Sequence, residues 1–433
     1  MHYEIGTMHL QDMYELSTLE NGLRVVTVAM PQAYSVSAGL YLGVGSRYET
    51  DAEAGASHFI EHLLFKGTER RPTPRDIALA IEGVGGSINA STGREVTSYY
   101  ARVARHDFGL AADVLADMVL NSRFLPTDVE REAQVIVEEI NESQDMPDDI
   151  VFMEAQQILY PHHALGRDIA GTRESVRALN RDALLGYMTQ GYAPGNAVVA
   201  VAGGVTHAQV VETIGELLGG WQGSHTLTTV PYLGKPEARV KVINRPVEQT
   251  HIVLATHAYH RYHPDRFALS LLNSILGEGM SSRLFVEIRE ERGLAYSVYS
   301  YVSALNDTGT FAVYAAVDQE QTDTTIQAVL GELHRLREEL IEDEEMEFAK
   351  AYMRGSLLLS LEHSGTNAGW VGNRLITSNT IPTPEEVVAN FERVTSADIQ
   401  RVARDLFRDE ALLLSLVGPI KSEKSWESLL RVE

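Results

Sequence analysis

The chain of 433 residues contains a long internal repeat, and this repeat limits the folds that it can adopt. Three segments recur at a nearly constant offset of 215 positions: residues 24–26 at 239–241, 180–183 at 395–398, and 196–204 at 410–418. Chance similarity between two apolar strands does not explain an offset that is shared near both ends, whereas a duplicated domain does. The sequence therefore predicts two homologous domains, 12–222 and 238–425. The segment between them, 222–237, is rich in Thr, Gly and Pro and reads as a linker.

Hydrophobic periodicity within the first copy predicts both helices and strands. The expected strands are 23–30, 35–44, 87–92, 95–103 and 196–202, with 95–103 as the antiparallel partner of 87–92. The expected helices are 54–64, 75–82, 107–121, 127–141 and 206–218. We therefore expect an α+β fold of two homologous α/β-sandwich-like domains, each a mostly antiparallel sheet with helices packed on one face.

The composition excludes several functional classes. The net charge is −24, from 60 acidic and 36 basic residues, which argues against nucleic acid or an anionic membrane as a partner. The sequence has no cysteine, so disulfides, thiolate metal sites and cysteine nucleophiles are excluded. No apolar run is long enough to span a membrane, and residues 1–14 do not resemble a signal peptide. We expect a cytoplasmic protein.

Residues 58–62 read His-Phe-Ile-Glu-His within a predicted helix. His58 and His62 are one turn apart on the same face, so they can hold one divalent metal ion. Glu61 lies beside them and can take a proton from a water molecule on that metal. The order H-x-x-E-H is the inverted form of the commoner H-E-x-x-H zinc motif. On these residues alone, histidines that only pack or face solvent remain the alternative.

The second copy lacks this motif, because Asn273 and Gly277 stand at the positions equivalent to His58 and His62. One copy therefore carries the metal chemistry, and the other is free for another task.

A zinc site needs a third protein ligand and an open position for water. The predicted helix 127–141 and the residue that follows it supply five candidates: Glu130, Glu132, Glu138, Glu139 and Glu142. Glu132 and Glu139 are seven positions apart and share one face of the helix. Spacing alone does not choose among the five, since most acidic residues on such a helix face solvent.

Three segments, HFIEHLLFKGT, GGSINASTGREVTSYY and REAQVIVEEINE, resemble the pitrilysin (insulinase) family of inverzincin metallopeptidases. The resemblance covers about residues 15–420 and is to the short two-domain bacterial type, which is similar to the subunits of mitochondrial processing peptidase. It implies that His58, His62 and Glu139 bind Zn²⁺, that Glu61 is the catalytic base, and that Glu132 is a supporting carboxylate in the catalytic group. Glu138 is the nearest rival of Glu139, by a shift of one residue.

The resemblance also implies where the substrate lies. By itself the segment Asn89-Ala90-Ser91 reads as an ordinary sheet strand, and Arg289 and Tyr296 read as surface and packing residues. In the family, the strand holds the peptide as an added strand. The Arg and Tyr of the second half bind the substrate backbone and stabilise the oxyanion. The remaining histidine groups have no metal spacing and are expected to pack or to lie in loops: His162, His163, His251, His257, His260 and His263.

The sequence thus predicts a zinc-dependent endopeptidase that hydrolyses unfolded oligopeptides or short polypeptides inside a closed chamber. The alternative is a non-catalytic peptide-binding or scaffold subunit of a complex like processing peptidase. The metal motif and the Arg289–Tyr296 pair lie in different halves, so two chains can complete each other's sites. We expect a homodimer, with a heterodimer with a sister subunit as the alternative.

Overall fold

The computed structural model describes residues 13–420 and 426–432, which form two compact units. The first unit takes the residues up to Glu138, Asp168–Thr229 and Leu358–Thr383. The second takes Glu139–Arg167, Val230–Leu357 and the residues from Pro384 onward. Each unit therefore includes a segment from the other side of the linker. The predicted division by duplication into domains 12–222 and 238–425 stays a prediction.

A six-stranded sheet forms the centre of the first unit, in the order β1-β2-β6-β3-β5-β4. All neighbouring strands are antiparallel except β2 and β6, which are parallel. The strands are β1 (Glu15–Thr18), β2 (Arg24–Ala29), β3 (Ser35–Leu42), β4 (Ser87–Thr92), β5 (Thr97–Ala104) and β6 (Ala197–Gly203). Strand β4 lies at one edge, and β5 is its antiparallel partner as predicted.

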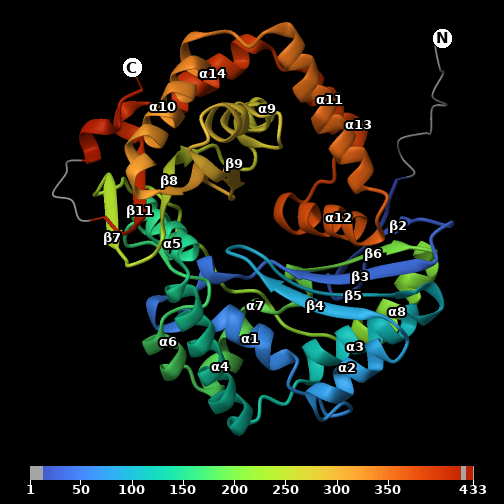
Figure 1. The fold of residues 1–433 in the computed structure, drawn as a ribbon. Helices are drawn as coiled ribbons and strands as arrows, with labels where there is room; N and C mark the ends of the chain where they lie inside the picture. The colour runs from blue at the N-terminus through green and yellow to red at the C-terminus, as the bar shows by residue number, and fades with distance from the viewer. Residues whose placement is uncertain (1–12, 421–425, 433) are drawn as a thin grey trace, which may run out of the picture. The chain divides into compact units, whose positions relative to one another are not determined.

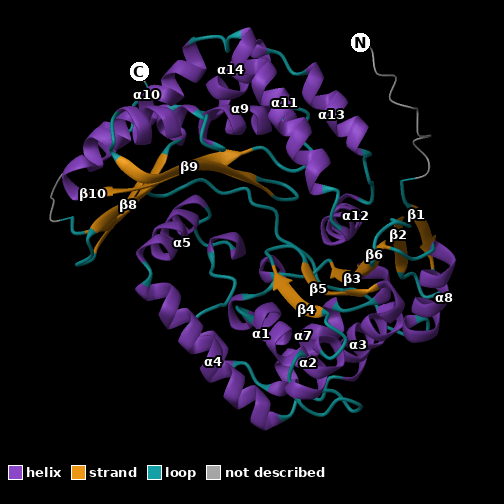
Figure 2. Cartoon of the chain, turned by 45° about the vertical axis from the view of Figure 1, so that its right-hand side comes forward, coloured by secondary structure: helices purple, strands orange, loops and turns teal. Residues whose placement is uncertain are grey.

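Helices cover both faces of this sheet, as Figure 2 shows. Helices α1, α2, α3 and α7 lie on one face, and α12 lies on the other, against β3 and β6. The helices of this unit are α1 (Ala56–Leu64), α2 (Pro74–Glu82), α3 (Phe108–Asn121), the first part of α4 (Pro126–Asp145), α6 (Arg173–Ala178), α7 (Arg181–Gly191), α8 (His207–Leu218) and α12 (Ser364–Ser378).

The sheet of the second unit has the order β7-β11-β8-β10-β9. This is the order of the first sheet without β1, and β7 and β11 are parallel as β2 and β6 are. The strands are β7 (Val240–Asn244), β8 (Gln249–Ala258), β9 (Ala295–Ala304), β10 (Gly309–Asp318) and β11 (Leu413–Gly418). The predicted α+β class is confirmed, with two mostly antiparallel sheets of matching topology.

Helices α9, α10 and α14 pack on one face of the second sheet, and α5 packs on the other, against β8 and β11 (Figure 1). The helices of this unit are α5 (Pro147–Leu159), α9 (Arg266–Gly277), α10 (Thr322–Glu338), α11 (Asp343–Ser360), α13 (Pro384–Arg393) and α14 (Ser396–Leu406). Among the described residues, no helix is long and apolar enough to cross a membrane.

Helices α5 and α12 are equivalent in the repeat but have been exchanged between the sheets. Residues 147–159 plus the offset of 215 fall on 362–374, which lies almost entirely within α12. Helix α5 packs Val151 and Leu159 against the second sheet, and α12 packs Val371 and Leu375 against the first. Each sheet is thus covered by a helix from the other half of the sequence.

The expectation of helices on one face only was wrong, and the central strands explain why. Strand β6 is buried at every position, and so is β11. A strand that buries the side chains of both faces needs a layer on each side. Other differences are small. Strand β5 begins at Thr97, and Glu95 lies before it and pairs with Arg47. Helix α4 continues past residue 141 to Asp145, just before Pro147.

The start of α1 is fixed by a glycine and a buried carboxylate. Gly55 caps the helix at φ +93°, and a Cβ there would lie 2.5 Å from the Ala170 carbonyl oxygen. Glu49 is 5% exposed and accepts hydrogen bonds from the backbone N–H groups of Gly55 and Ser57, both at 2.8 Å. Its negative charge lies at the positive end of the helix. Glu49 therefore sets where the helix begins.

Replacing Glu49 tests this anchor. We expect Glu49→Ala to lower the free energy of unfolding by about 2–4 kcal/mol, because a helix cap is lost and buried N–H groups lose their acceptor. Urea unfolding of zinc-free protein followed by circular dichroism measures the change. Glu53→Ala is the matched control, because its carboxylate caps an exposed turn at Thr50, and we expect a loss of about 1 kcal/mol or less. Equal losses would contradict the anchor.

Candidate metal centre

Helix α1 separates its apolar and polar residues onto different faces. Phe59, Ile60 and Leu63 are buried, whereas His58, Glu61 and His62 are only partly buried. The apolar side fixes the helix in the unit, and the three polar side chains are presented together. This is the face that the motif predicts.

The two histidine rings point their Nε2 atoms toward each other. The Nε2 atoms of His58 and His62 lie 3.3 Å apart, and the ring planes are 73° to each other. Two nitrogens bound to one tetrahedral zinc ion, each at about 2.0–2.1 Å, are about 3.3 Å apart. The two imidazoles therefore fit a single zinc ion.

Glu139 completes a possible ligand set with the two histidines. One ligand atom from each of His58, His62 and Glu139 lies within 4.8 Å of the other two. Glu139 lies on α4, which is continuous from Pro126 to Asp145. Glu138, the rival by one residue, accepts a hydrogen bond from Gln134 at 2.7 Å on the exposed side of the helix.

Glu132 is not one of the three possible metal ligands but contacts one of them, His62. It is 2% exposed, and its carboxylate lies 3.2 Å from His62 Nδ1 and 2.7 Å from Lys66 Nζ. A carboxylate only accepts, so His62 donates from Nδ1 and keeps the lone pair of Nε2 for a metal. Burial alone would raise the pKa of Glu132, but the hydrogen bonds from His62 and Lys66 outweigh it and the pKa is lowered.

The carboxylate of Glu61 is held from the sheet. Thr92, the last residue of β4, donates a hydrogen bond from its hydroxyl group to Glu61 Oε2. Behind them, Tyr99 and Tyr192 share a buried hydrogen bond of 2.9 Å. Burial is the main cause that raises the pKa of both phenols, and the charge of Glu61 adds to it. The two hydroxyl groups therefore stay protonated beside a carboxylate.

The predicted substrate strand lies at the edge of its sheet. Asn89, Ala90 and Ser91 belong to β4, which pairs with β5 as the last strand in the order. The side-chain oxygen of Asn89 accepts a hydrogen bond from the Ala90 N–H at 2.8 Å. An edge strand can accept a further strand through its backbone.

Arg289 and Tyr296 meet each other in the second unit. Arg289 lies in a π-helical segment, Phe285–Glu291, and Tyr296 lies at the start of β9 and is 77% exposed. The guanidinium carbon is 4.5 Å from the centre of the tyrosine ring. This stacking arrangement holds the two side chains together at the surface of the unit.

The second unit has Asn273 and Gly277 at the equivalent positions, and both are closely packed. Asn273 bonds to the hydroxyl group of Ser300 at 2.8 Å. A Cβ at Gly277 would lie 2.4 Å from the same residue. Strand β9 thus approaches α9 closely at these two positions.

The other histidine groups behave as packing residues. His257 packs against Tyr160 and Tyr232, and His251 bonds to Tyr314 at 2.9 Å. His163 accepts a hydrogen bond from the Leu165 N–H. In the part of the chain that the structure describes, only His58, His62 and Glu139 form a group of three or more ligand atoms close enough for a metal.

Comparison with known proteins identifies the family. The model described as Insulinase (Peptidase family M16) matches residues 24–173, and the model described as Peptidase M16 inactive domain matches residues 178–353. An uncharacterized zinc protease of Streptomyces coelicolor is 38% identical over 416 residues, which is 94% of this chain and 90% of that protein. This chain belongs to the insulinase family of peptidases.

Other relatives agree with this assignment. An uncharacterized zinc protease of Bacillus subtilis is 35% identical over 409 residues, covering 94% of this chain and 98% of that protein. The crystal structure of a protease from Helicobacter pylori has the same fold, with a TM-score of 0.87 at 24% identity over 94% of this chain and 99% of that chain. The names of the relatives identify the cofactor as Zn²⁺, as expected.

Sequence reasoning missed three residues that hold the site together: Glu49, Lys66 and Thr92. Lys66 is one turn beyond His62 on the sequence, so its place beside the ligands could have been found from helical spacing. Glu49 and Thr92 come from a loop and from β4, and helical periodicity carries no signal for them. Only the packing of α1 against these segments brings them into contact.

The choice between Glu139 and Glu138 can be tested directly. Loss of a residue that only hydrogen-bonds to a metal ligand weakens metal affinity by about 10–100-fold. Glu139 is expected to bind the metal itself, so we expect Glu139→Gln to weaken zinc binding by more than about 100-fold. Glu138→Gln changes an exposed neighbour and should bind zinc as the wild type does. Competition with a chelator of known affinity measures both variants, and circular dichroism confirms that they are folded. The reverse result would shift the ligand by one residue.

Proposed function

We propose that this protein is a zinc-dependent endopeptidase in which His58, His62 and Glu139 bind the metal. The observation that carries the proposal is the convergence of two imidazole nitrogens and one carboxylate beside Glu61. The name zinc protease, given to relatives that align over more than 90% of this chain, supports the same activity.

When bound, Zn²⁺ supplies Lewis acidity to the scissile carbonyl and to the attacking water. Glu61 then takes a proton from that water and delivers it to the leaving amine. Thr92 keeps one oxygen of Glu61 occupied, which leaves the other oxygen to accept the proton. Glu132 holds His62 in the tautomer that a metal needs.

In this proposal β4 aligns the substrate. A peptide that pairs with the edge strand along Asn89, Ala90 and Ser91 is bound through its backbone, so recognition tolerates many sequences. Such pairing requires an extended peptide. This supports unfolded oligopeptides or short polypeptides as substrates, and a folded domain cannot offer its backbone in this way.

Arg289 and Tyr296 belong to the second unit, and in this proposal they complete the site. A guanidinium and a phenol are suitable donors to the oxygen that becomes negative in the transition state. Their stacked arrangement supports a joint role. We propose that they act within a closed chamber formed by a homodimer, in which the second unit of one chain covers the first unit of its partner.

The alternative function is a non-catalytic peptide-binding or scaffold subunit, and the alternative assembly is a heterodimer with a sister subunit. Zinc content together with turnover of a quenched peptide separates an enzyme from a scaffold. A scaffold would bind the peptide and leave it uncut.

The role of Glu61 can be separated from that of the ligands. We expect Glu61→Gln to keep its zinc and to lose about 10²–10⁴-fold in kcat, because the amide cannot take the proton from water. Turnover of a quenched peptide and metal analysis measure the two effects. Glu82→Gln, an exposed position on α2, is the matched control and should keep both. Loss of zinc from the Glu61 variant, or substantial remaining activity, would rule out the assigned role.

Mixing two inactive proteins tests the assembly. Glu61→Gln has a defect in the first unit, and a chain with both Arg289→Ala and Tyr296→Ala has a defect in the second. If sites are shared between chains, a mixed dimer contains one intact site and activity returns. Native mass spectrometry confirms exchange between the two proteins. Exchange without recovered activity would show that each chain completes its own site, or that a different partner is needed.

A further inference from the structure

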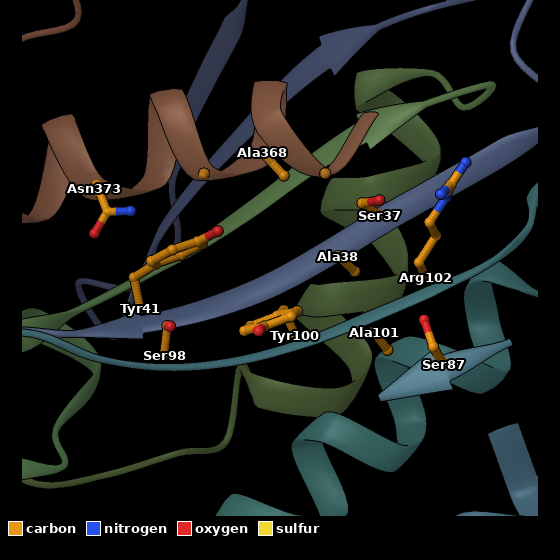
Figure 3. Close-up of a pocket in the computed structure, with 12 residues that line it drawn as sticks. Ser37, Ala38, Tyr41, Ser87, Ser98, Tyr100, Ala101, Arg102, Ala368 and Asn373 are labelled. Carbon is orange, nitrogen blue, oxygen red and sulfur yellow. The ribbon is translucent and has the colours of Figure 1, made fainter. Parts of the chain in front are cut away.

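A cavity of about 360 Å³ lies in the first unit, between the sheet and α12. Its lining side chains come from β3, β4 and β5 and from α12, as can be followed in Figure 3. We call it the α12 pocket and define it by six residues: Ser37, Tyr41, Ser87, Tyr100, Arg102 and Asn373. None of them belongs to the metal centre.

The pocket opens on the face of the sheet opposite to α1. Ser87 pairs with Arg102, and Asn89 pairs with Tyr100, and paired residues of antiparallel strands point to the same face. Thr92 has the opposite parity on β4 and reaches Glu61 on α1. A peptide strand added to β4 therefore directs alternate side chains toward the pocket and the others toward the metal helix.

The charge of the pocket is opposite to that of the protein. Arg102 is the one cation in its lining, which contains no Asp or Glu among the described residues. Arg102 is exposed and makes no ion pair or side-chain hydrogen bond within residues 13–420 and 426–432. The remaining polar groups are hydroxyl groups and an amide, which can all donate hydrogen bonds. In a chain of net charge −24, this pocket is suited to an anion.

The spacing relates the pocket to the proposed substrate strand. Neighbouring strands lie about 4.8 Å apart, so a peptide beyond β4 lies about 10 Å from β5. The small side chain of Ser87 on β4 lies between the peptide and Arg102 on β5. The long side chain of Arg102 and an acidic side chain of the peptide can together span the distance of about 10 Å between the two strands. Ser87 is five residues from Thr92, which corresponds to about 17 Å along the strand.

We propose that the α12 pocket binds a carboxylate of the peptide substrate about five residues from the scissile bond. The carboxylate belongs either to an Asp or Glu side chain or to the C-terminus of the peptide, and Arg102 binds it through charge-assisted hydrogen bonds. This inference rests on the proposed function, since it places the peptide along β4. It gives a sequence-tolerant backbone site one charged determinant.

The test measures peptide binding without hydrolysis, in zinc-loaded Glu61→Gln protein. Fluorescent peptides carry a single Glu or Gln at successive positions, and each is made with a C-terminal carboxylate or amide. We expect Arg102→Gln in this background to weaken binding of the matching acidic peptide about 10-fold or more, because one charge-assisted interaction is lost. Binding of the corresponding neutral peptide should not change.

Two further variants keep the result specific. Arg75→Gln removes an exposed positive charge from α2, outside the pocket, and should leave all affinities unchanged. Gly369→Leu fills the pocket without a change of charge and should remove the preference for the acidic peptide. A Cβ at Gly369 meets its nearest atom, the Tyr41 hydroxyl oxygen, at 3.9 Å, so the backbone accepts a side chain there.

The outcomes assign the source of the carboxylate and decide the proposal. A preference for Glu over Gln at one position identifies a side chain, and a preference for the free acid over the amide identifies the C-terminus. If Arg102→Gln weakens binding of acidic and neutral peptides equally, or does not weaken binding at all, the proposed role of the α12 pocket is wrong. If wild-type protein does not cleave but the charge preference persists, the peptidase proposal fails and the pocket stands.

Discussion

Burial of the central strands on both faces is the constraint on which both units depend. Strands β6 and β11 expose none of their side chains, so each sheet needs helices on two sides. The helices that supply the second layer, α5 and α12, occupy equivalent places in the repeat, and each packs on the sheet that the other half of the sequence forms. Neither half of the sequence buries its own sheet alone. Each unit therefore depends on both halves of the sequence.

Helix α1 and its equivalent in the second unit, α9, have different chemical surroundings. In the first unit, α1 is anchored by Glu49 and presents its histidines beside Glu132, Lys66 and Thr92. In the second unit, the equivalent helix packs closely on β9 through Asn273 and Gly277. Neither Asn273 nor Gly277 supplies an imidazole, and both pack against Ser300 of β9. The second copy has kept the fold and has lost the ligands.

The charged groups of the metal centre and of the α12 pocket differ in sign and in whether they have a partner. The buried Glu132 carboxylate is compensated by Lys66 and by the His62 ring, so its charge serves to orient a ligand. Arg102 has no such partner among the described residues and its charge remains available to a ligand. Strand β4 lies between these two environments, and alternate residues face each of them. A single edge strand can thus connect chemistry on one face with recognition on the other.

The sequence by itself determined the features that depend on local periodicity and spacing. A helix repeats every 3.6 residues, so His58, Glu61 and His62 had to share one face. The offset of the repeat predicted two homologous domains, and hydrophobic periodicity predicted the strands 87–92 and 95–103 as antiparallel partners. Glu139 was selected by the resemblance, because helical spacing alone kept five carboxylates in contention.

Only the tertiary structure decided the contacts between distant segments. Thr92 reaches Glu61, Glu49 caps α1, and α12 covers β3 although the two lie more than 300 residues apart in the chain. These contacts follow from how elements pack, and packing depends on shape and burial across the whole unit instead of on neighbouring residues. The α12 pocket exists for the same reason, since its lining comes from β3, β4, β5 and a helix of the other half.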